Sequence, residues 1–406
     1  MTISLFLLAF FSIPSFSFIG AGKYVTWVVT IFLLTTIAVS LALFYPIKID
    51  ILSISLLFFV VSAFLSSAIT AFKSFKITPY YLAVLIFLLY TYFRSVKKTI
   101  NLKSFIFAAY IGTVLFLFFY IVKYRNEILS LSFERLGKLF GDENDIALFL
   151  SFGAACSLYY FSEVNKTNIV FPFISMLLFL LFAFCGFTTG SKIFILVLFL
   201  SFIFIPFKIC GKKKWWIALL IIIIGLLLFY AVIHLPFMYT IKQRFYGFIS
   251  TLLGISVESG STREMSTVNR LDMFLCGIEM WLKRPMFGWG SWGFATYSGA
   301  TGGWSHNNFS ESLCNFGLVG TVLFNFGFII SFISYFSMCS VEKKKYSIMF
   351  FLLLFYIVAM FGVALNSQKL YAYVIGVVFA GLTELKTLMC IDLKTMRLNK
   401  KGRKDL

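Results

Sequence analysis

Long apolar runs separated by short polar segments make up almost the whole chain. A helix that crosses a bilayer needs about 20 mostly apolar residues, because its backbone polar groups find no water there. The first run has neither a basic segment before it nor a small-residue cleavage site, so we expect a retained helix and not a signal peptide. We expect twelve membrane-spanning helices, at residues 3–19, 24–44, 51–71, 77–93, 104–122, 145–162, 169–187, 193–209, 215–235, 313–336, 346–364 and 370–385.

One long polar stretch, residues 236–312, interrupts this pattern. The composition agrees with it, since 60% of the residues are hydrophobic, 54 are Phe and only 13% are charged, which excludes a soluble fold. The sequence therefore predicts an all-α polytopic membrane protein with about 12 transmembrane helices and one large external loop. Its expected parts are helices 1–9 (1–235), the loop (236–312), helices 10–12 (313–385) and a basic tail (386–406).

The positions of Lys and Arg predict the orientation, because basic loops resist translocation. Both termini are expected in the cytoplasm, which places the long loops 123–144 and 236–312 on the opposite side. The net charge of +19 then reflects topology and affinity for membrane lipids with anionic headgroups, and no nucleic-acid module is present. The basic clusters expected in the cytoplasm are Arg94, Lys97, Lys98 and Lys103; Lys208 and Lys212–Lys214; Lys343–Lys345; and the tail from Lys386 to Lys404.

Common motifs of metal and nucleotide chemistry are missing from the sequence. The seven Cys show no CxxC spacing, and the two His, His234 and His306, cannot build a zinc site alone. The chain has no HExxH, GxxxxGK or GxGxxG motif. We therefore expect no metal and no cofactor.

The external loop contains three distinct parts. Residues 264–283 carry an apolar stripe at three- and four-residue spacing, which predicts an amphipathic helix at the membrane surface or against the bundle. FGWGSWGF at 287–294 alternates Gly with aromatic residues that suit the headgroup level or a sugar face. SGATGGWSHNNFSES at 298–312 brings polar side chains to the next helix. The stripe comprises Val268, Leu271, Leu275, Ile278 and Leu282.

Four motifs in order resemble the O-antigen polymerase and O-antigen ligase superfamily of bacterial envelope glycan assembly. They are RLGKLFGDENDIALFL (135–150), TTGSK (188–192), NRLDMFLCGIEMWLKRPMFGWGSWGF (269–294) and SHNNFSESLCNFGLVG (305–320). The resemblance also covers the topology of the whole chain. One position departs from it: the family usually has Arg where this chain has Lys192, so a bidentate phosphate fork becomes a point charge.

The resemblance implies a metal-independent glycosyltransferase of the C-type membrane fold in the bacterial inner membrane, with its large loop in the periplasm. Its substrate would be an undecaprenyl-diphosphate-linked oligosaccharide, with a chain-length regulator and a flippase as further candidate partners. Cleaving a bond between a sugar and a diphosphate requires positive charge at the leaving group, and the external loops offer Arg and Lys for this. The attacking hydroxyl must lose its proton, which suits an external histidine.

On this basis we assign His306 as the general base and Arg270 as the main diphosphate ligand. Asn307 or Glu311 would orient the histidine, and Trp304, Trp289 and Trp292 would support sugar rings or anchor the loop. Asp142 and Asn144 are expected to cap the helix that starts near 145. Each assignment has a structural alternative. His306 could be a solvated loop residue, Arg270 could form an ion pair on the helix surface, and Lys192 could extend its side chain to the membrane surface. Lys76 and Lys369 are assigned to membrane topology alone. Further candidate ligands of the diphosphate are Lys192, Arg135, Arg244 and Arg263.

Three functions remain open. A polymerase would move a growing glycan from one lipid diphosphate onto the sugar hydroxyl of another lipid-linked repeat unit. A ligase would move the finished glycan onto lipid A core, and a flippase or transporter would carry out no chemistry. Transporters more often show polar or broken helices at the membrane midplane and internal symmetry, which disfavours the third. The excess of Phe, Ile, Leu and Lys indicates an AT-rich gene and favours the polymerase.

The topology can be tested by labelling single cysteines with a membrane-impermeant maleimide. Cysteines at Ser256 and Gly299 should react in intact spheroplasts, because both positions lie in the predicted external loop. Cysteines at Lys213, Lys344 and Lys401 should react only after the membrane is broken. A cysteine at Gly299 that is protected until lysis would place the loop in the cytoplasm and remove the basis of the site assignments.

Overall fold

The computed structural model is entirely helical in the part of the chain that it describes. Ten of the described helices coincide with the ten runs predicted from residue 51 onward. The runs 3–19 and 24–44 lie almost wholly outside the described residues. These residues are 31, 35–39, 49–95, 102–130, 136, 143–163, 170–210, 215–234, 239, 242–243, 246, 262–299, 305–361 and 369–383.

Their helices are α3 (Ile51–Ile69), α4 (Thr78–Ser95), α5 (Leu102–Lys123), α6 (Arg125–Leu129), α7 (Glu143–Ser162), α8 (Val170–Thr188), α9 (Lys192–Cys210), α10 (Trp215–Ile233), α12 (Thr262–Lys283), α13 (Gly293–Tyr297), α14 (Asn308–Phe336), α15 (Ser340–Lys345), α16 (Ser347–Ala359) and α17 (Lys369–Thr383).

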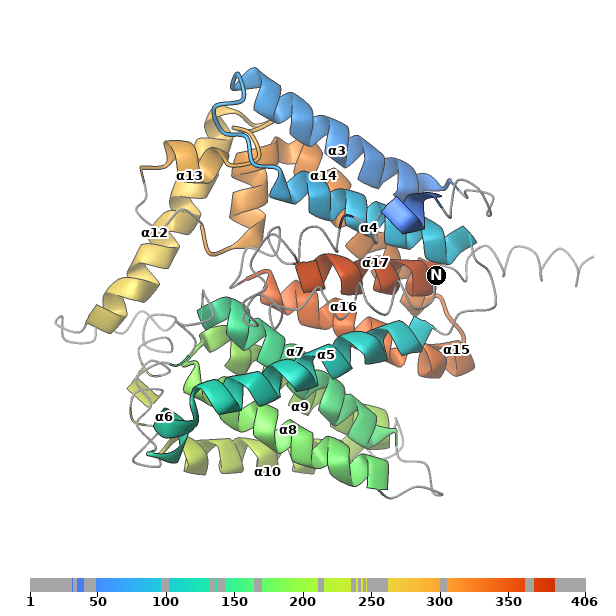
Figure 1. Ribbon diagram of the computed structural model, residues 1–406, viewed down its shortest axis with the longest axis vertical. Coiled ribbons are helices and arrows are strands. Elements are labelled where there is room, and N and C mark those ends of the chain that lie inside the picture. The colour runs from blue at the N-terminus through green and yellow to red at the C-terminus, as the bar shows by residue number, and fades with distance from the viewer. Residues whose placement is uncertain are drawn as a thin grey trace, which may run out of the picture.

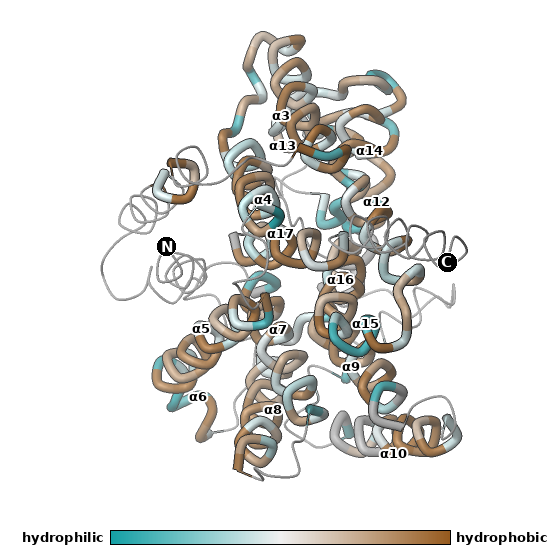
Figure 2. Tube along the Cα trace, turned by 90° about the vertical axis from the view of Figure 1, so that its right-hand side faces the viewer, coloured by the Kyte–Doolittle hydropathy of each residue, from teal (hydrophilic) through white to brown (hydrophobic). Residues whose placement is uncertain are grey.

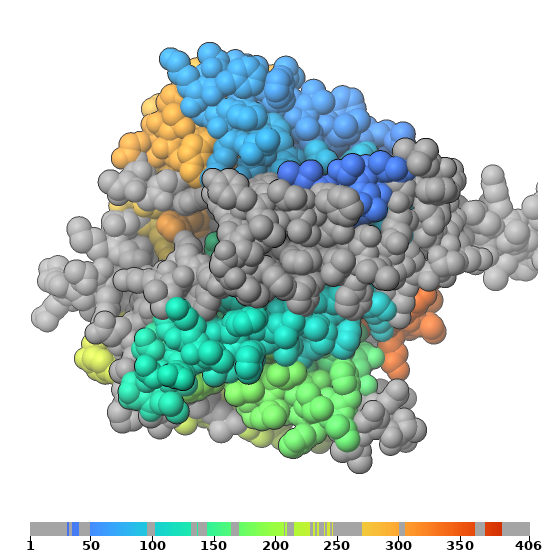
Figure 3. All heavy atoms as spheres, in the orientation of Figure 1, coloured from blue at the N-terminus to red at the C-terminus, as the bar shows by residue number. Residues whose placement is uncertain are grey.

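Five of these helices, α3, α5, α7, α8 and α14, are long and apolar enough to cross a membrane. Four shorter apolar helices accompany them, within α9, α10, α16 and α17. Large apolar side chains of α3 and α8 are exposed, as expected where a helix faces lipid. Figure 2 shows that both helices are mostly hydrophobic, and Figure 3 shows them at the surface. The chain is therefore a multi-pass membrane protein, and the total of twelve spans stays a prediction.

The polar helices gather at the ends of the bundle. Figure 1 shows α6, α12 and α13 at its left end and the basic helix α15 at its right end. The predicted topology requires this separation, because 123–144 and 236–312 were expected on one side and Lys343–Lys345 on the other. The side that faces the cytoplasm stays a prediction.

A break in α14 fixes the architecture at the end that carries α12 and α13. Gly317 has non-helical angles (φ 65°, ψ −170°), and α14 bends there (Figure 1). The break removes the helical partners of two carbonyls and two amides, and the loop after α12 replaces them. Leu318 N donates to Pro285 O (2.7 Å) and Val319 N to Met286 O (3.2 Å). Trp289 N donates to Cys314 O and Gly290 N to Asn315 O, both at 2.9 Å.

Serines of α3 complete this joint, which we define as residues 285–290 together with 314–319. Ser66 Oγ donates to Asn315 O (2.6 Å) and accepts from Gly290 N (2.8 Å). Ser67 Oγ accepts from Ser291 N at 3.1 Å. These hydroxyls explain why an otherwise apolar helix carries a polar face, since that face binds backbone groups of two other segments.

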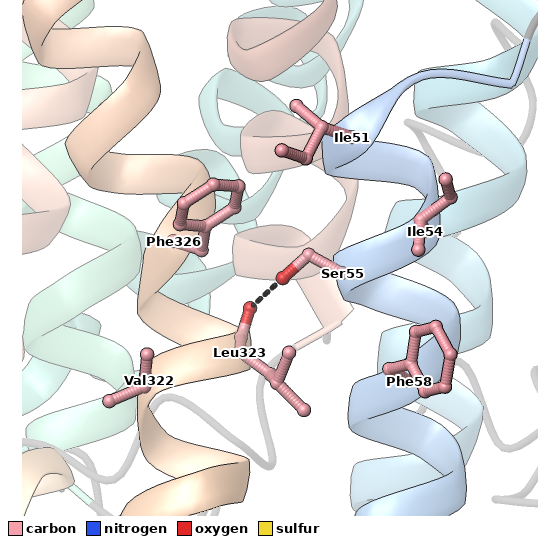
Figure 4. Close-up of a pocket in the computed structure, with 7 residues that line it drawn as sticks. All are labelled: Ile51, Ile54, Ser55, Phe58, Val322, Leu323 and Phe326. Atoms are coloured by element: carbon pink, nitrogen blue, oxygen red, sulfur yellow. Dashed lines mark hydrogen bonds between the residues drawn. The ribbon is translucent and has the colours of Figure 1, made fainter.

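Further along the same two helices, α3 and α14 enclose an open apolar groove of about 260 Å³ (Figure 4). Its only polar side chain, Ser55, donates to Leu323 O (2.8 Å), so its hydroxyl already has a partner. The groove therefore offers no group for chemistry. It is lined by Ile51, Ile54, Ser55, Phe58, Val322, Leu323 and Phe326.

Helix α12 forms where the amphipathic pattern predicted it, but the apolar stripe does not pack on the bundle. Leu271, Leu275 and Leu282 are 53%, 48% and 63% exposed. The opposite face meets α14, because a Cβ on Gly277 would lie 3.2 Å from Ser310 Cβ and Met280 is buried. These three leucines of the stripe therefore do not pack on the bundle, and the location of the stripe at the membrane surface stays a prediction.

The joint predicts a large cost for any side chain at Gly317. Its positive φ strains other residues, and a Cβ there would overlap the carbonyl of Met286. Gly317→Ala should lower the free energy of unfolding by about 2–6 kcal/mol, as strain and overpacking each cost about 1–3 kcal/mol. Thermal unfolding of the purified protein in detergent measures this loss.

Gly225→Ala in α10 is the matched control, since the nearest atom to its Cβ would be 3.7 Å away. Ala is favoured over Gly within a helix by about 0.5–1 kcal/mol, so this variant should melt at or slightly above the wild-type temperature. Equal melting temperatures for Gly317→Ala and the wild type would show that the joint does not carry the fold.

Candidate active site

His306 lies just before the first turn of α14 and has a strained backbone conformation. Its φ of 54° is rare for a residue with a Cβ and is commonest at functional sites. Asn307 caps the helix, because its Oδ1 accepts from Phe309 N (2.9 Å) and Ser310 N (3.2 Å). The backbone after His306 is thereby fixed.

Glu311 fixes the backbone before His306. Its carboxylate is 2% exposed, and Oε2 accepts from both the N–H and the hydroxyl of Ser305 at 3.2 Å. The Ser305 hydroxyl also approaches Asn307 O at 2.7 Å, within hydrogen-bond distance. A carboxylate in a first turn is also favoured by the helix dipole. Asn307 and Glu311 thus hold the chain on either side of the histidine.

Lys76 of the α3–α4 turn contacts the loop after α12, which the sequence did not reveal. Its Nζ lies 3.3 Å from the centre of the Trp292 ring, and its backbone N donates to Ser291 Oγ at 2.8 Å. The one available signal was a lysine in a short loop that is predicted to be external, which runs against the usual charge distribution.

Trp289 and Trp292 anchor the loop after α12. Trp289 Nε1 donates to Met280 O (2.7 Å), and the Arg284 guanidinium lies 4.1 Å above its ring. The Trp292 ring carries the ammonium of Lys76. The tryptophan rings were predicted either to support sugar rings or to anchor the loop. Their contacts within the protein fit the anchoring role.

Arg270 lies on the face of α12 that packs on α14. Gly277 faces Ser310, and Met280 meets Cys314 with 3.8 Å between the sulfurs, so the two helices run in the same direction here. Arg270 is seven residues before Gly277, which places it on the same face and about 10 Å further along the axis. Its half-buried side chain therefore starts beyond the N-terminus of α14, on the side where His306 precedes that helix.

The TTGSK motif forms a buried turn before α9, with Lys192 half-buried in the first turn of that helix. Ser191 Oγ donates to Asn144 Oδ1 (3.0 Å), and Leu136 N donates to Thr188 O (3.0 Å). Because α7 begins at Glu143, Asn144 lies inside its first turn and bonds the turn before α9, instead of capping α7 as predicted.

The structure thus joins the four motifs in two pairs, 135–150 with 188–192 and 269–294 with 305–320. Met360 O accepts from Asn308 N at 2.9 Å and connects the second pair to α16. Four predicted site residues lack a described side chain: Arg135, Arg244 and Trp304 lie outside the described residues, and Arg263 is placed only by its backbone in α12.

A family model described as O-Antigen ligase matches residues 174–325. The chain carries an O-antigen ligase family domain. This domain runs from α8 into α14 and contains Lys192, Arg270, His306, Asn307 and Glu311, but not Arg135 or Lys76. A search of curated proteins finds no match to the chain. Within the described residues of the domain and of the rest of the chain, no group of three or more His, Cys, Asp or Glu could hold a metal ion.

The hydrogen bonds at Glu311 predict different effects for two substitutions in this domain. Glu311→Leu leaves the N–H of Ser305 without its acceptor, while the Ser305 hydroxyl can still donate to Asn307 O, and should cost about 1–3 kcal/mol of stability. Glu311→Gln keeps an accepting oxygen and should lose less than about 1 kcal/mol. Thermal unfolding of both variants checks this order, and a glutamine variant as unstable as the leucine variant would show that the negative charge matters more than the hydrogen bonds.

Proposed function

We propose that the protein is an O-antigen, or surface polysaccharide, polymerase of the bacterial inner membrane. It would transfer a growing glycan from polyprenyl diphosphate to a sugar hydroxyl of another lipid-linked repeat unit. The observation that carries this proposal is a family domain that holds a strained histidine and a half-buried arginine at one end of the membrane bundle. Members of this family transfer glycans in surface polysaccharide assembly.

The reaction forms a bond between the acceptor oxygen and the anomeric carbon and breaks the bond from that carbon to the diphosphate. In our proposal, His306 Nδ1 or Nε2 takes the proton of the acceptor hydroxyl. Arg270 stabilises the negative charge on the departing polyprenyl diphosphate, with Lys192 as a further ligand. Arg135, Arg244 and Arg263 are candidate contributors, and Trp304 is a candidate sugar contact. Charged side chains suffice for this step, so we propose that it needs no metal.

The second candidate function is ligation of the finished glycan to lipid A core, which the name of the matching family favours. The two reactions share the donor and differ in the acceptor. Both require the loop 236–312 in the periplasm and both termini in the cytoplasm, which we propose as the topology. An AT-rich composition, typical of strain-specific surface-antigen genes, is our reason to prefer the polymerase.

Deletion of the gene, followed by gel analysis of surface polysaccharide, distinguishes these functions. Loss of the ladder down to core plus one repeat unit identifies a polymerase, because single units are still ligated. Core alone identifies a ligase, because no glycan reaches it. An unchanged ladder would exclude both.

Complementation of the deletion tests the assigned residues. His306→Ala should reduce transfer by about 10²–10⁴-fold, the usual loss for a general base, while binding of the lipid-linked donor persists. Arg270→Ala should weaken donor binding and abolish chain extension. His234→Ala and Lys283→Ala are the matched controls, since His234 is the other of the two histidines and Lys283 is exposed at the end of α12; both should retain full activity.

A loss of donor affinity in proportion to activity in His306→Ala would assign the histidine to the diphosphate or to the structure. Full activity of Arg270→Ala would assign that arginine to the surface of α12. Either result would contradict the division of roles between acceptor and donor.

A further inference from the structure

Asn308 is a fully buried carboxamide that has no hydrogen bond. Its exposed fraction is 0%, and among the residues that the structure describes neither Oδ1 nor Nδ2 has a partner. Buried side-chain amides in folded proteins almost always have partners, because an unpaired buried polar group is destabilising. Such a group therefore requires an explanation at its particular position.

Its position is the first residue of α14, two residues after His306. Its backbone N–H donates to Met360 O at the end of α16, so the Cα is held from outside its own helix. Glu311 and Asn315 follow at intervals of three and seven residues and share its face. Both neighbours are paired, Glu311 by Ser305 and Asn315 Oδ1 by the N–H of Phe294 at 2.8 Å. Of these three residues, Asn308 is the one whose two polar side-chain atoms, Oδ1 and Nδ2, both have no partner.

We propose that Asn308 binds a hydroxyl of the acceptor sugar next to the one that attacks. This inference rests on the proposed glycan transfer and adds a specificity residue to it. A carboxamide donates through nitrogen and accepts through oxygen, so it pairs with a sugar hydroxyl in both senses. The placement fits, because the group that takes the proton and the group that orients the ring would come from adjacent turns of one chain segment.

The strain at His306 gives the acceptor a way to reach Asn308. Residues 305–307 precede the helix and are hydrogen-bonded to its first turn through Ser305 and Asn307, and a backbone held at φ 54° relaxes when these bonds yield. Binding of the acceptor then replaces an unpaired amide by a paired one. The free energy gained is available only to a sugar with a hydroxyl at the matching position.

A matched control exists in the same helix. Thr321 lies beyond the break at Gly317, is 9% exposed, and its hydroxyl also has no partner among the described residues. It resembles Asn308 in burial and lack of partner but lies three turns further into the bundle. Thr321→Val thus removes an unpaired buried group that our proposal leaves without a role.

The experiment compares Asn308→Leu and Thr321→Val with the wild type, each purified in nanodiscs. The acceptor probe is the repeat-unit oligosaccharide released by mild acid from lipid-linked units of cells that lack this gene. Asn308→Leu should raise the acceptor KM or Kd by about tenfold to a hundredfold, as expected when a site loses a paired polar contact. Its donor affinity should stay within about twofold, and its melting temperature should equal or exceed that of the wild type.

Three outcomes would overturn the proposal. A fall in the melting temperature of Asn308→Leu would show that the amide is structural and paired through water. Unchanged acceptor affinity would show that it does not contact the sugar, and an equal loss in Thr321→Val would show that the effect is not local.

Failure of the proposed function is distinguishable from failure of this inference. If the wild type transfers no glycan, direct binding of the oligosaccharide still decides the role of Asn308. If the wild type does not bind the oligosaccharide, Asn308 has no acceptor to recognise and the inference fails as well.

Discussion

The exchange of backbone hydrogen bonds at Gly317 is the constraint on which the end of the bundle that carries α12 and α13 depends. Two helical bonds of α14, from Leu318 N to Cys314 O and from Val319 N to Asn315 O, are replaced by four bonds to residues 285–290. An unpaired backbone group is costly where water is excluded, so the break persists only because the loop satisfies it. The same bonds hold α12 against α14, which places Arg270 and His306 at one end of the bundle.

The sequence predicts the helices well and the break poorly. Ten runs of apolar residues give ten helices because a spanning helix needs little more than apolar length. SLCNFGLVG reads as continuous helix, and a single Gly inside such a run is common in membrane helices. What makes Gly317 a break is the carbonyl of Met286 in contact with it, and that contact joins segments about 30 residues apart. The predicted start at 313 was also late, because the polar residues 308–312 are helical and buried among neighbouring segments.

For the candidate site, the sequence predicts the chemical groups but not the residues that position them. The order of motifs predicts His306, Arg270 and Glu311 as site residues, and these three lie at the same end of the structure. It did not identify Lys76 or Asn308, because a lone lysine and a second asparagine carry no pattern. Nor did the amphipathic stripe of α12 indicate the packing face. Gly277 and Met280 decide that face, because a residue without a side chain permits the close approach to Ser310.

Two kinds of residue therefore share this site, and they differ in what a substitution would reveal. In our proposal His306, Arg270 and Asn308 act through their side chains, so their loss should change kinetics while the fold persists. Gly317 permits the break in α14, and Glu311 and the serines of α3 bind backbone groups, so their loss should change stability first and activity as a consequence. Since the strained backbone of His306 is held by hydrogen bonds from Ser305, Asn307 and Met360, its conformation follows from those supports. The histidine is thus placed by the fold before any substrate binds.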